Sequence, residues 1–210
     1  MSEDLSALAA AIEAGDRPSA TASTRSAIEA GLRPEEILAA MTAAMDIVGQ
    51  RFQANEIFVP EMLISARAMK EATAMLEPLL VAAGIKPEFT AVIGTISGDL
   101  HDIGKNLVGM MLKGANFAVV DLGTNVEAER FVSAAREHGA HLVCVSALLT
   151  TTMTGMGGAV AAIRAADLAG VKVLVGGAPV TPEFASQIGA DGYAPDAGSA
   201  VVVARQVLAS

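Results

Sequence analysis

The apolar side chains of this chain change their spacing near residue 84, and this change limits the folds open to it. Before that point they recur at helical intervals, as in Ile37, Leu38 and Met41, so that they share one helix face. After it, short apolar runs alternate with further segments of helical spacing. A helical region followed by strand–helix alternation predicts a helix bundle and then a parallel sheet covered by helices.

Prolines mark the expected helix starts in the first region. Pro18, Pro34 and Pro60 stand at these starts, because proline suits a first turn, whose N–H groups lack partners anyway. Pro78 falls inside the last helix, where proline can bend it. Short connections make the helices neighbours in a four-helix bundle. The expected helices are 3–14, 18–30, 35–50 and 60–83.

The second region reads as a flavodoxin-like domain. Alternating strands and helices favour a parallel sheet with right-handed crossovers, and five strands suit the doubly wound order 2-1-3-4-5. The segment 84–88 is the expected linker, which gives a helical domain at 1–86 and an α/β domain at 87–210. The expected strands are 89–97, 116–121, 141–146, 171–175 and 191–194, followed by a helix near 197–208.

An Asp-x-His-x-x-Gly segment follows the first expected strand, at the sheet edge where such folds bind ligands. Asp99 can accept a hydrogen bond from His101, which would fix the ring and make its other nitrogen a better metal ligand. Gly104 would let a ligand approach the backbone. A single histidine in a loop can also be an ordinary loop residue, so the other strand ends have to support a site.

The loops after the third and fourth strands carry small and hydroxyl-bearing residues. Ser146 and Thr150–Thr152 follow the third strand, and Gly176 and Gly177 follow the fourth. We expect the hydroxyls to face His101 and the glycines to let an elongated group lie against the backbone. Hydroxyls after a strand can instead cap the next helix.

Composition excludes several classes. A net charge of −9 and the absence of Trp argue against nucleic-acid binding. No apolar stretch reaches the ~20 residues that span a bilayer. Cys144 is the only cysteine, which excludes a disulfide framework and favours a reducing compartment. The acidic first residues lack the basic region of a secretory signal, so a cytoplasmic protein is expected.

Three ordered motifs resemble the cobalamin-binding domain of corrinoid-dependent methyltransferases. They are Asp99-x-His101-x-x-Gly104, Ser146-x-Leu148 and Gly176-Gly177. The helical half is similar to the cap domain of the same family, at Arg51-Phe52, at 58–63 and at 76–78. The resemblance extends from about residue 5 to residue 208.

The resemblance implies cobalamin, as methylcobalamin or another corrinoid, bound base-off with His101 as the lower axial cobalt ligand. Asp99 would hold His101, and Thr152 stands where relatives have a serine that completes the relay. Met62, one of the residues that would cover the upper corrin face, can equally be bundle core. The remaining implied cofactor residues are Asp102, Ile103, Gly104, Ser146, Leu148, Thr150, Gly176, Gly177 and Tyr193, with Gly123 and Asp196 near the tunnel mouth and Phe52, Val59 and Met62 in the cap.

A chain with cap and cobalamin domains looks like the corrinoid carrier of a multi-component methyltransferase system, itself non-catalytic. The resemblance implies a substrate-specific methyltransferase, a second methyltransferase that acts on a thiol or tetrahydrofolate, and a reductive activase. Glu56, Glu61 and Lys105 are candidate partner contacts.

Other functions stay open. A cobalamin-dependent sensor has a similar domain order but normally adds a basic DNA-binding segment. The cobalamin subunit of a carbon-skeleton mutase would not need the cap, and a phospho-acceptor domain would need an aspartate where Ser146 stands. A zinc site would have to use His101, His138, His141 and Cys144, whose placement suits helix ends and strands better.

Overall fold

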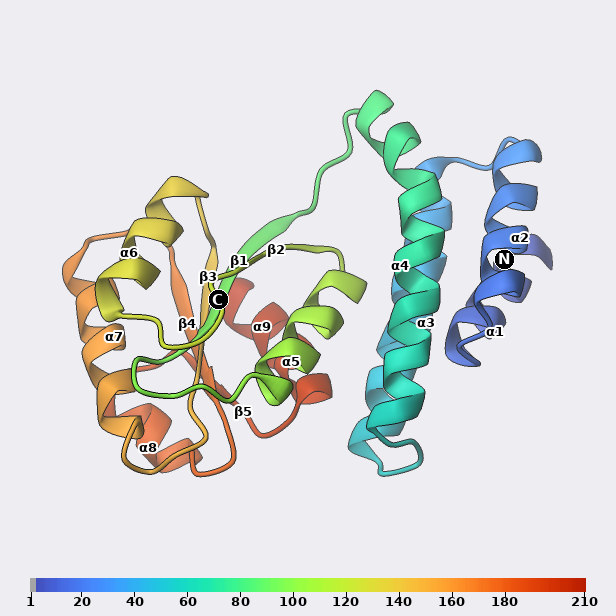
Figure 1. Ribbon diagram of the computed structural model, residues 1–210. Coiled ribbons are helices and arrows are strands. Elements are labelled where there is room, and N and C mark those ends of the chain that lie inside the picture. The colour runs from blue at the N-terminus through green and yellow to red at the C-terminus, as the bar shows by residue number, and fades with distance from the viewer. Residues whose placement is uncertain (1–2) are drawn as a thin grey trace. The chain divides into compact units, whose positions relative to one another are not determined.

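The computed structural model describes residues 3–210 and divides into two compact units (Figure 1). One unit extends to Pro87 and includes Gly114–Asn116. The other consists of Glu88–Lys113 and Phe117–Ser210. The first two residues of the predicted helical domain lie outside the described part of the chain.

The helical unit contains four helices, as the spacing predicts. They are α1 (Glu3–Glu13), α2 (Arg17–Glu29), α3 (Pro34–Gln53) and α4 (Val59–Ala82). Helix α1 packs against α2 and α3, and α4 packs against α2 and α3. Helix α2 begins one residue before the expected start because Asp16 caps it, accepting a hydrogen bond from the Ser19 N–H at 3.1 Å. Helix α4 contains Pro78.

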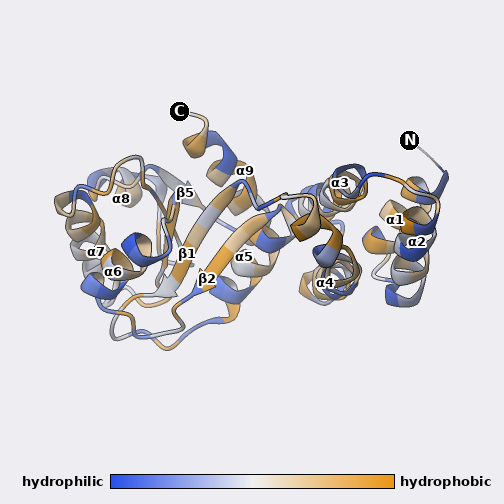
Figure 2. Ribbon diagram, turned by 90° about the horizontal axis from the view of Figure 1, so that it is seen from above, coloured by the Kyte–Doolittle hydropathy of each residue, from blue (hydrophilic) through white to orange (hydrophobic). Residues whose placement is uncertain are grey.

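The α/β unit has the predicted five-stranded parallel sheet in the order β2-β1-β3-β4-β5. Figures 1 and 2 show α6, α7 and α8 on one side of it and α5 and α9 on the other. The predicted fold class is therefore confirmed. The strands are β1 (Phe89–Thr95), β2 (Phe117–Asp121), β3 (Leu142–Ser146), β4 (Lys172–Gly176) and β5 (Gly192–Ala194), and the helices are α5 (Ile103–Gly114), α6 (Ala128–Glu137), α7 (Met153–Ala165), α8 (Pro182–Gln187) and α9 (Ala197–Leu208).

The strands are apolar because both faces of the sheet are covered, and Figure 2 shows β2 and much of β1 in the hydrophobic colour. Phe131 of α6 is completely buried in the core that β1, β3 and β4 form with α6 and α7. A Cβ atom at Gly94 would lie 2.9 Å from the Phe131 ring. Glycine in the middle of β1 therefore makes room for this aromatic side chain.

The sheet register places small residues in one row at the carboxyl ends of four strands. Thr95 pairs with Ser146, Ser146 with Gly176, and Gly176 with Ala194. Two residues predicted for the site, Ser146 and Gly176, are thus direct neighbours across the sheet. The row lies at the edge where doubly wound folds bind ligands.

None of the helices within residues 3–210 is both long and apolar enough to cross a membrane.

Candidate functional site

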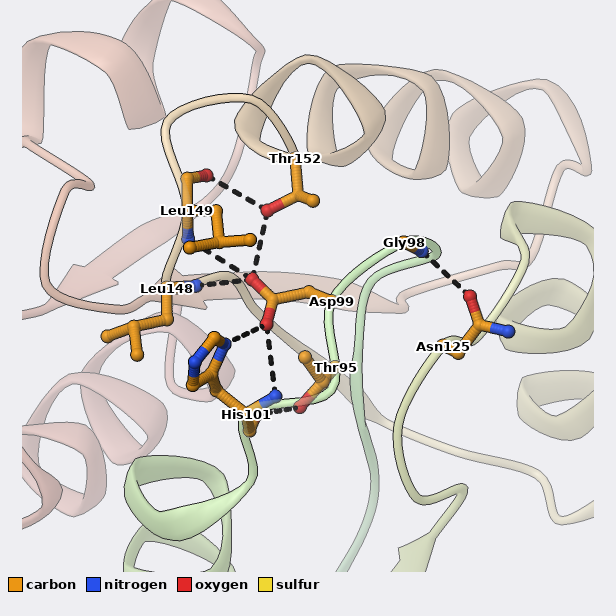
Figure 3. A network of polar contacts seen from close by, with 8 residues as sticks. All are labelled: Thr95, Gly98, Asp99, His101, Asn125, Leu148, Leu149 and Thr152. Atoms are coloured by element: carbon orange, nitrogen blue, oxygen red, sulfur yellow. Dashed lines mark hydrogen bonds and ion pairs between the residues drawn. The ribbon is translucent and has the colours of Figure 1, made fainter.

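The site is centred on the loop that joins β1 to α5 (Figure 3). Asp99 Oδ1 lies 2.7 Å from His101 Nδ1 and accepts the His101 backbone N–H at 3.0 Å. The contact between the carboxylate and the ring is the one that the sequence predicts. The Asp99 side chain is buried, whereas the His101 side chain is 50 % exposed. The loop therefore holds a hidden carboxylate behind an accessible imidazole.

The second oxygen of Asp99 binds groups from the loop after β3. Asp99 Oδ2 accepts hydrogen bonds from the Leu148 N–H at 2.7 Å, the Leu149 N–H at 3.2 Å and the Thr152 hydroxyl at 2.9 Å. Thr152 Oγ1 also lies 2.9 Å from the Leu149 carbonyl oxygen. The structure thus brings Asp99, His101 and Thr152 together. The two leucine amides could not be predicted, because backbone donors leave no residue-type signal.

Asp99 is held in its ionised form. Burial by itself would raise the pKa of this carboxyl group, but the backbone N–H groups of His101 and Leu148 and the donors on His101 and Thr152 lower it well below its usual range. An ionised Asp99 can only accept a hydrogen bond, so Nδ1 of His101 must carry the hydrogen. The neutral ring is therefore assigned the tautomer in which Nε2 has no hydrogen.

The outer nitrogen of His101 is available to a ligand. Within residues 3–210 no group makes a hydrogen bond to Nε2. A neutral imidazole that donates Nδ1–H to a carboxylate is the usual arrangement of a metal-binding histidine. Over the same residues, no group of three or more His, Cys, Asp or Glu side chains is placed to hold a metal ion. The arrangement suits a metal that already has its other ligands.

Large apolar side chains around His101 are exposed. Leu100 and Ile103 are each 74 % exposed, and Leu148 and Leu149 are 43 % and 40 % exposed. Exposed apolar groups of this kind, gathered on the segment 100–103 and on the loop after β3, are typical of a binding surface. Two of them, Ile103 and Leu148, belong to the predicted set.

Two further predicted residues lie at the start of α5. Asp102 Oδ2 accepts a hydrogen bond from the Asn106 side chain at 3.0 Å. A Cβ atom at Gly104 would meet nothing within 4 Å. The packing of the chain therefore does not require glycine at this position, and the space above it is open to a ligand.

The glycine pair at the end of β4 is required by the close approach of neighbouring backbone. Gly177 has φ +126°, and a Cβ atom there would lie 1.8 Å from the Ala147 carbonyl oxygen. A Cβ atom at Gly176 would lie 2.8 Å from the Ala194 carbonyl oxygen. These glycines allow the end of β4 to lie against the loop after β3 and against β5.

The hydroxyl groups after β3 do not act as one cluster. Thr152 reaches Asp99, but Thr150 and Thr151 are exposed, and within the described chain neither side chain has a hydrogen bond to the His101 loop. Of these three threonines, Thr152 is the one with a side-chain hydrogen bond to Asp99, and the role of Thr150 at the cofactor stays a prediction.

Other predicted residues have local roles or lie elsewhere. Asp196 caps α9, accepting the Ser199 N–H at 2.8 Å, and Gly123 donates its N–H to Asp121 at 2.9 Å. Tyr193 is a partly exposed residue of β5. The predicted cap residues belong to the helical unit: Phe52 and Val59 are partly exposed and Met62 is 1 % exposed.

Lys105 differs most from expectation. It is a candidate partner contact in the sequence, yet its side chain is only 2 % exposed and Nζ lies 2.6 Å from Asp121 at the end of β2. Burial opposes ionisation of Asp121, but the hydrogen bond from Lys105 holds the pKa of this carboxyl below its usual value. Lys105 is therefore an internal ion-pair residue of the α/β unit. Glu61 is also engaged, since it accepts the Phe58 N–H and caps α4.

Comparisons with known proteins agree with this geometry. The family described as B12 binding domain matches residues 89–202, and a second family with the same description matches residues 5–77. Trimethylamine corrinoid protein 2 of Methanosarcina acetivorans is 42 % identical over 190 residues, which cover 89 % of this chain and 88 % of that protein. The chain belongs to the B12-binding corrinoid proteins.

Solved structures extend the likeness to nearly the whole chain. A cobalamin-binding protein from Desulfitobacterium hafniense matches with a TM-score of 0.84 and 28 % identity, covering 98 % of this chain and 99 % of that one. A chain of the methanol:cobalamin methyltransferase complex MtaBC from Methanosarcina barkeri matches with a TM-score of 0.82 and 30 % identity, covering 99 % and 80 %. The cofactor of this corrinoid protein is cobalamin or a related corrinoid.

The residues present fit such a group. His101 offers a ring nitrogen that has no hydrogen-bond partner among residues 3–210, and a cobalt already held by its corrin ring would need a single ligand from the protein. Exposed apolar side chains surround the histidine, and the space beside Gly104 is free. A large cofactor that needs one protein ligand matches this surface.

Proposed function

We propose that this corrinoid protein carries a methyl group on cobalamin bound base-off, with His101 as the lower axial ligand of cobalt. The observation that supports this most is the fixed tautomer of His101: Nδ1 is bound to buried Asp99 at 2.7 Å, while the half-exposed ring leaves Nε2 free. When bound, the cofactor supplies the cobalt that accepts and releases the methyl group.

The side chains behind His101 control its charge and orientation. Ionised Asp99 stabilises the Nδ1 proton, and the Thr152 hydroxyl supports the carboxylate from the opposite side. Because the pKa of Asp99 is held low, the carboxylate stays ionised and keeps its hydrogen bond to Nδ1.

The rest of the predicted site extends along the sheet edge. We expect the row that contains Ser146 and Gly176 to adjoin the nucleotide tail of the cofactor, with Gly177 keeping the neighbouring loop close. Residues 1–86 would form the cap domain, and 87–210 the cobalamin domain. Phe52, Val59 and Met62 remain predicted cover for the upper corrin face.

Methyltransferases are the proposed partners. The matched chain of the MtaBC complex comes from an assembly with a methanol:cobalamin methyltransferase, and a close relative is named for trimethylamine. We propose that a substrate-specific methyltransferase loads the methyl group onto this protein. A second methyltransferase would remove the methyl group and pass it to a thiol or tetrahydrofolate. A reductive activase would reduce cofactor that has become oxidised.

The ligand assignment is tested by electron paramagnetic resonance of the protein reconstituted with hydroxocobalamin and reduced to Co(II). Isotope-labelled histidine in the protein should alter the nitrogen coupling, and His101→Ala should abolish the histidine-derived coupling. His138→Ala is the matched control, because His138 lies at the end of α6, away from the loop. Histidine-derived coupling that survives in His101→Ala would refute the assignment.

The carrier role needs a separate measurement. The absorption spectrum of methylcobalamin should arise only when a cognate methyltransferase and its methyl donor are both added. Preferential binding of adenosylcobalamin with release by light would instead favour a sensor.

A further inference from the structure

A hydroxyl group on the sheet contacts the main chain of His101. Thr95, the last residue of β1, is completely buried, and its Oγ1 donates a hydrogen bond to the His101 carbonyl oxygen at 2.9 Å (Figure 3). The sequence indicates no role for Thr95 beyond strand formation. A buried hydroxyl that binds the main chain of the proposed cobalt ligand calls for an explanation.

The hydrogen bonds of His101 come from two sources. Asp99 binds both the ring and the backbone N–H of His101, and Asp99 is itself held by groups of the loop after β3. Thr95 belongs to β1, which pairs with β2 on one side and β3 on the other. The Thr95 bond is therefore the one that ties His101 directly to the rigid sheet.

The neighbouring groups of the loop are fixed as well. The Asp99 N–H donates to the Ile96 carbonyl oxygen at 3.1 Å, and the Asp99 carbonyl oxygen accepts the Asn125 N–H at 3.0 Å. With the bonds of His101, every backbone polar group of Asp99 and His101 has a partner. The backbone of the loop is thus anchored at Asp99 and at His101, and the side chain of Leu100 between them is exposed.

We propose that Thr95 is a positioning residue for His101, which fixes through the main chain where the ring nitrogen stands. This inference rests on the proposed ligation by His101. Groups behind a metal-binding histidine typically change metal affinity by about 10-fold to 100-fold when removed. Thr95 acts one step further from the metal, so we expect about a tenfold loss of the histidine-ligated form, the lower end of that range.

Three variants of the full-length protein test the proposal. Thr95→Val replaces the hydroxyl by a methyl group of similar size and keeps a residue that favours strands. Thr95→Ser keeps the hydroxyl. Thr24→Val is the matched control, because Thr24 is equally buried and also donates to a carbonyl oxygen, that of Ala20 in α2 at 2.8 Å.

The readouts are the histidine-coupled fraction of the Co(II) signal and the rate of amide hydrogen exchange in residues 97–102 of the protein without cofactor. Thr95→Val should reduce the coupled fraction about tenfold, and it should raise the exchange rate of this segment by up to about tenfold, because one buried hydrogen bond that holds the loop is lost. Thr95→Ser should restore both, and Thr24→Val should change neither. If Thr95→Val does not fold, Thr95→Ala takes its place in the comparison with Thr95→Ser, because alanine also lacks the hydroxyl group.

Several results would overturn the proposal. Coupling and exchange in Thr95→Val could match those of the unchanged protein, or Thr95→Ser could behave like Thr95→Val, which would show that the hydroxyl group is not what positions His101. An equal loss in Thr24→Val would assign it to general stability. If the unchanged protein shows no histidine coupling, the ligation itself is wrong, and the exchange data still decide whether Thr95 anchors the loop.

Discussion

Gly177→Ala should strongly destabilise the α/β unit, because two separate features of the structure exclude a Cβ atom there. The backbone has φ +126°, and the added carbon would lie 1.8 Å from the Ala147 carbonyl oxygen. A non-glycine residue in a sparsely populated backbone region costs about 1–3 kcal/mol, and forced overpacking costs about the same again. We therefore expect a loss of about 4 kcal/mol in the free energy of unfolding.

The assay is urea unfolding of the cofactor-free protein, followed by tyrosine fluorescence. Tyr193 is the single tyrosine of a chain without tryptophan, and it pairs with Val175 on β4, two residues before Gly177. The signal therefore reports on this unit. With a slope of about 2 kcal/mol per molar urea, the midpoint should fall by about 2 M.

The matched control is Gly158→Ala. Gly158 lies in α7, and a Cβ atom there would meet nothing within 4 Å. Alanine in a helix is favoured over glycine by about 0.5–1 kcal/mol, so this variant should be slightly more stable than the unchanged protein. The same midpoint in both variants would show that the β4 loop relaxes freely, and the argument from the clash would then be wrong.

Three further predictions concern single side chains. Thr152→Val should weaken binding of hydroxocobalamin about tenfold in a titration, whereas Thr152→Ser should bind normally, because only the hydroxyl reaches the carboxylate behind the histidine. Lys105→Met should lower the urea midpoint at pH 7, since ionised Asp121 loses its cation. Folding lowers the pKa of Asp121, so the stabilisation by the ion pair is complete above the unfolded pKa of about 4 and is lost as the pH falls. The difference in urea midpoint between the unchanged protein and Lys105→Met should therefore be smaller at pH 3 than at pH 7. A difference that is larger at pH 3 would contradict the ion pair. Burial raises the pKa of the Cys144 thiol to about 12, so a thiol reagent at pH 8 should react only after unfolding, and rapid labelling of the native protein would show that the strand opens.

The fold follows from the sequence because its two halves follow simple rules. Helical spacing and first-turn prolines place all four helices of the bundle, and the apolar runs place the five strands to within about two residues of the observed ends. The remaining errors lie at helix ends. Helix α3 continues to Gln53 rather than to residue 50, since nothing in the sequence before Asn55, which adopts φ 57°, stops it.

The site could be predicted only where the side chain itself contacts its partner. The pairing of Asp99 with His101 depends on their separation by one residue, and Thr152 follows from the family motif. The amides of Leu148 and Leu149 and the Thr95 hydroxyl depend on how β1 and β3 lie beside each other, which no local pattern reveals. Lys105 looks like a surface cation in the sequence because its partner, Asp121, lies at the end of β2, 16 residues further along the chain.

The row of paired residues across the sheet has a consequence for how such a chain tolerates insertions and deletions. Thr95, Ser146 and Gly176 stay in line as long as β1, β3 and β4 keep their pairing. An extra residue in the turn between α7 and β4 leaves that pairing unchanged. An extra residue inside β3 moves Ser146 out of line and turns its side chain to the other face of the sheet. Length can therefore vary at the amino ends of the strands, while the residues at the carboxyl ends keep their places.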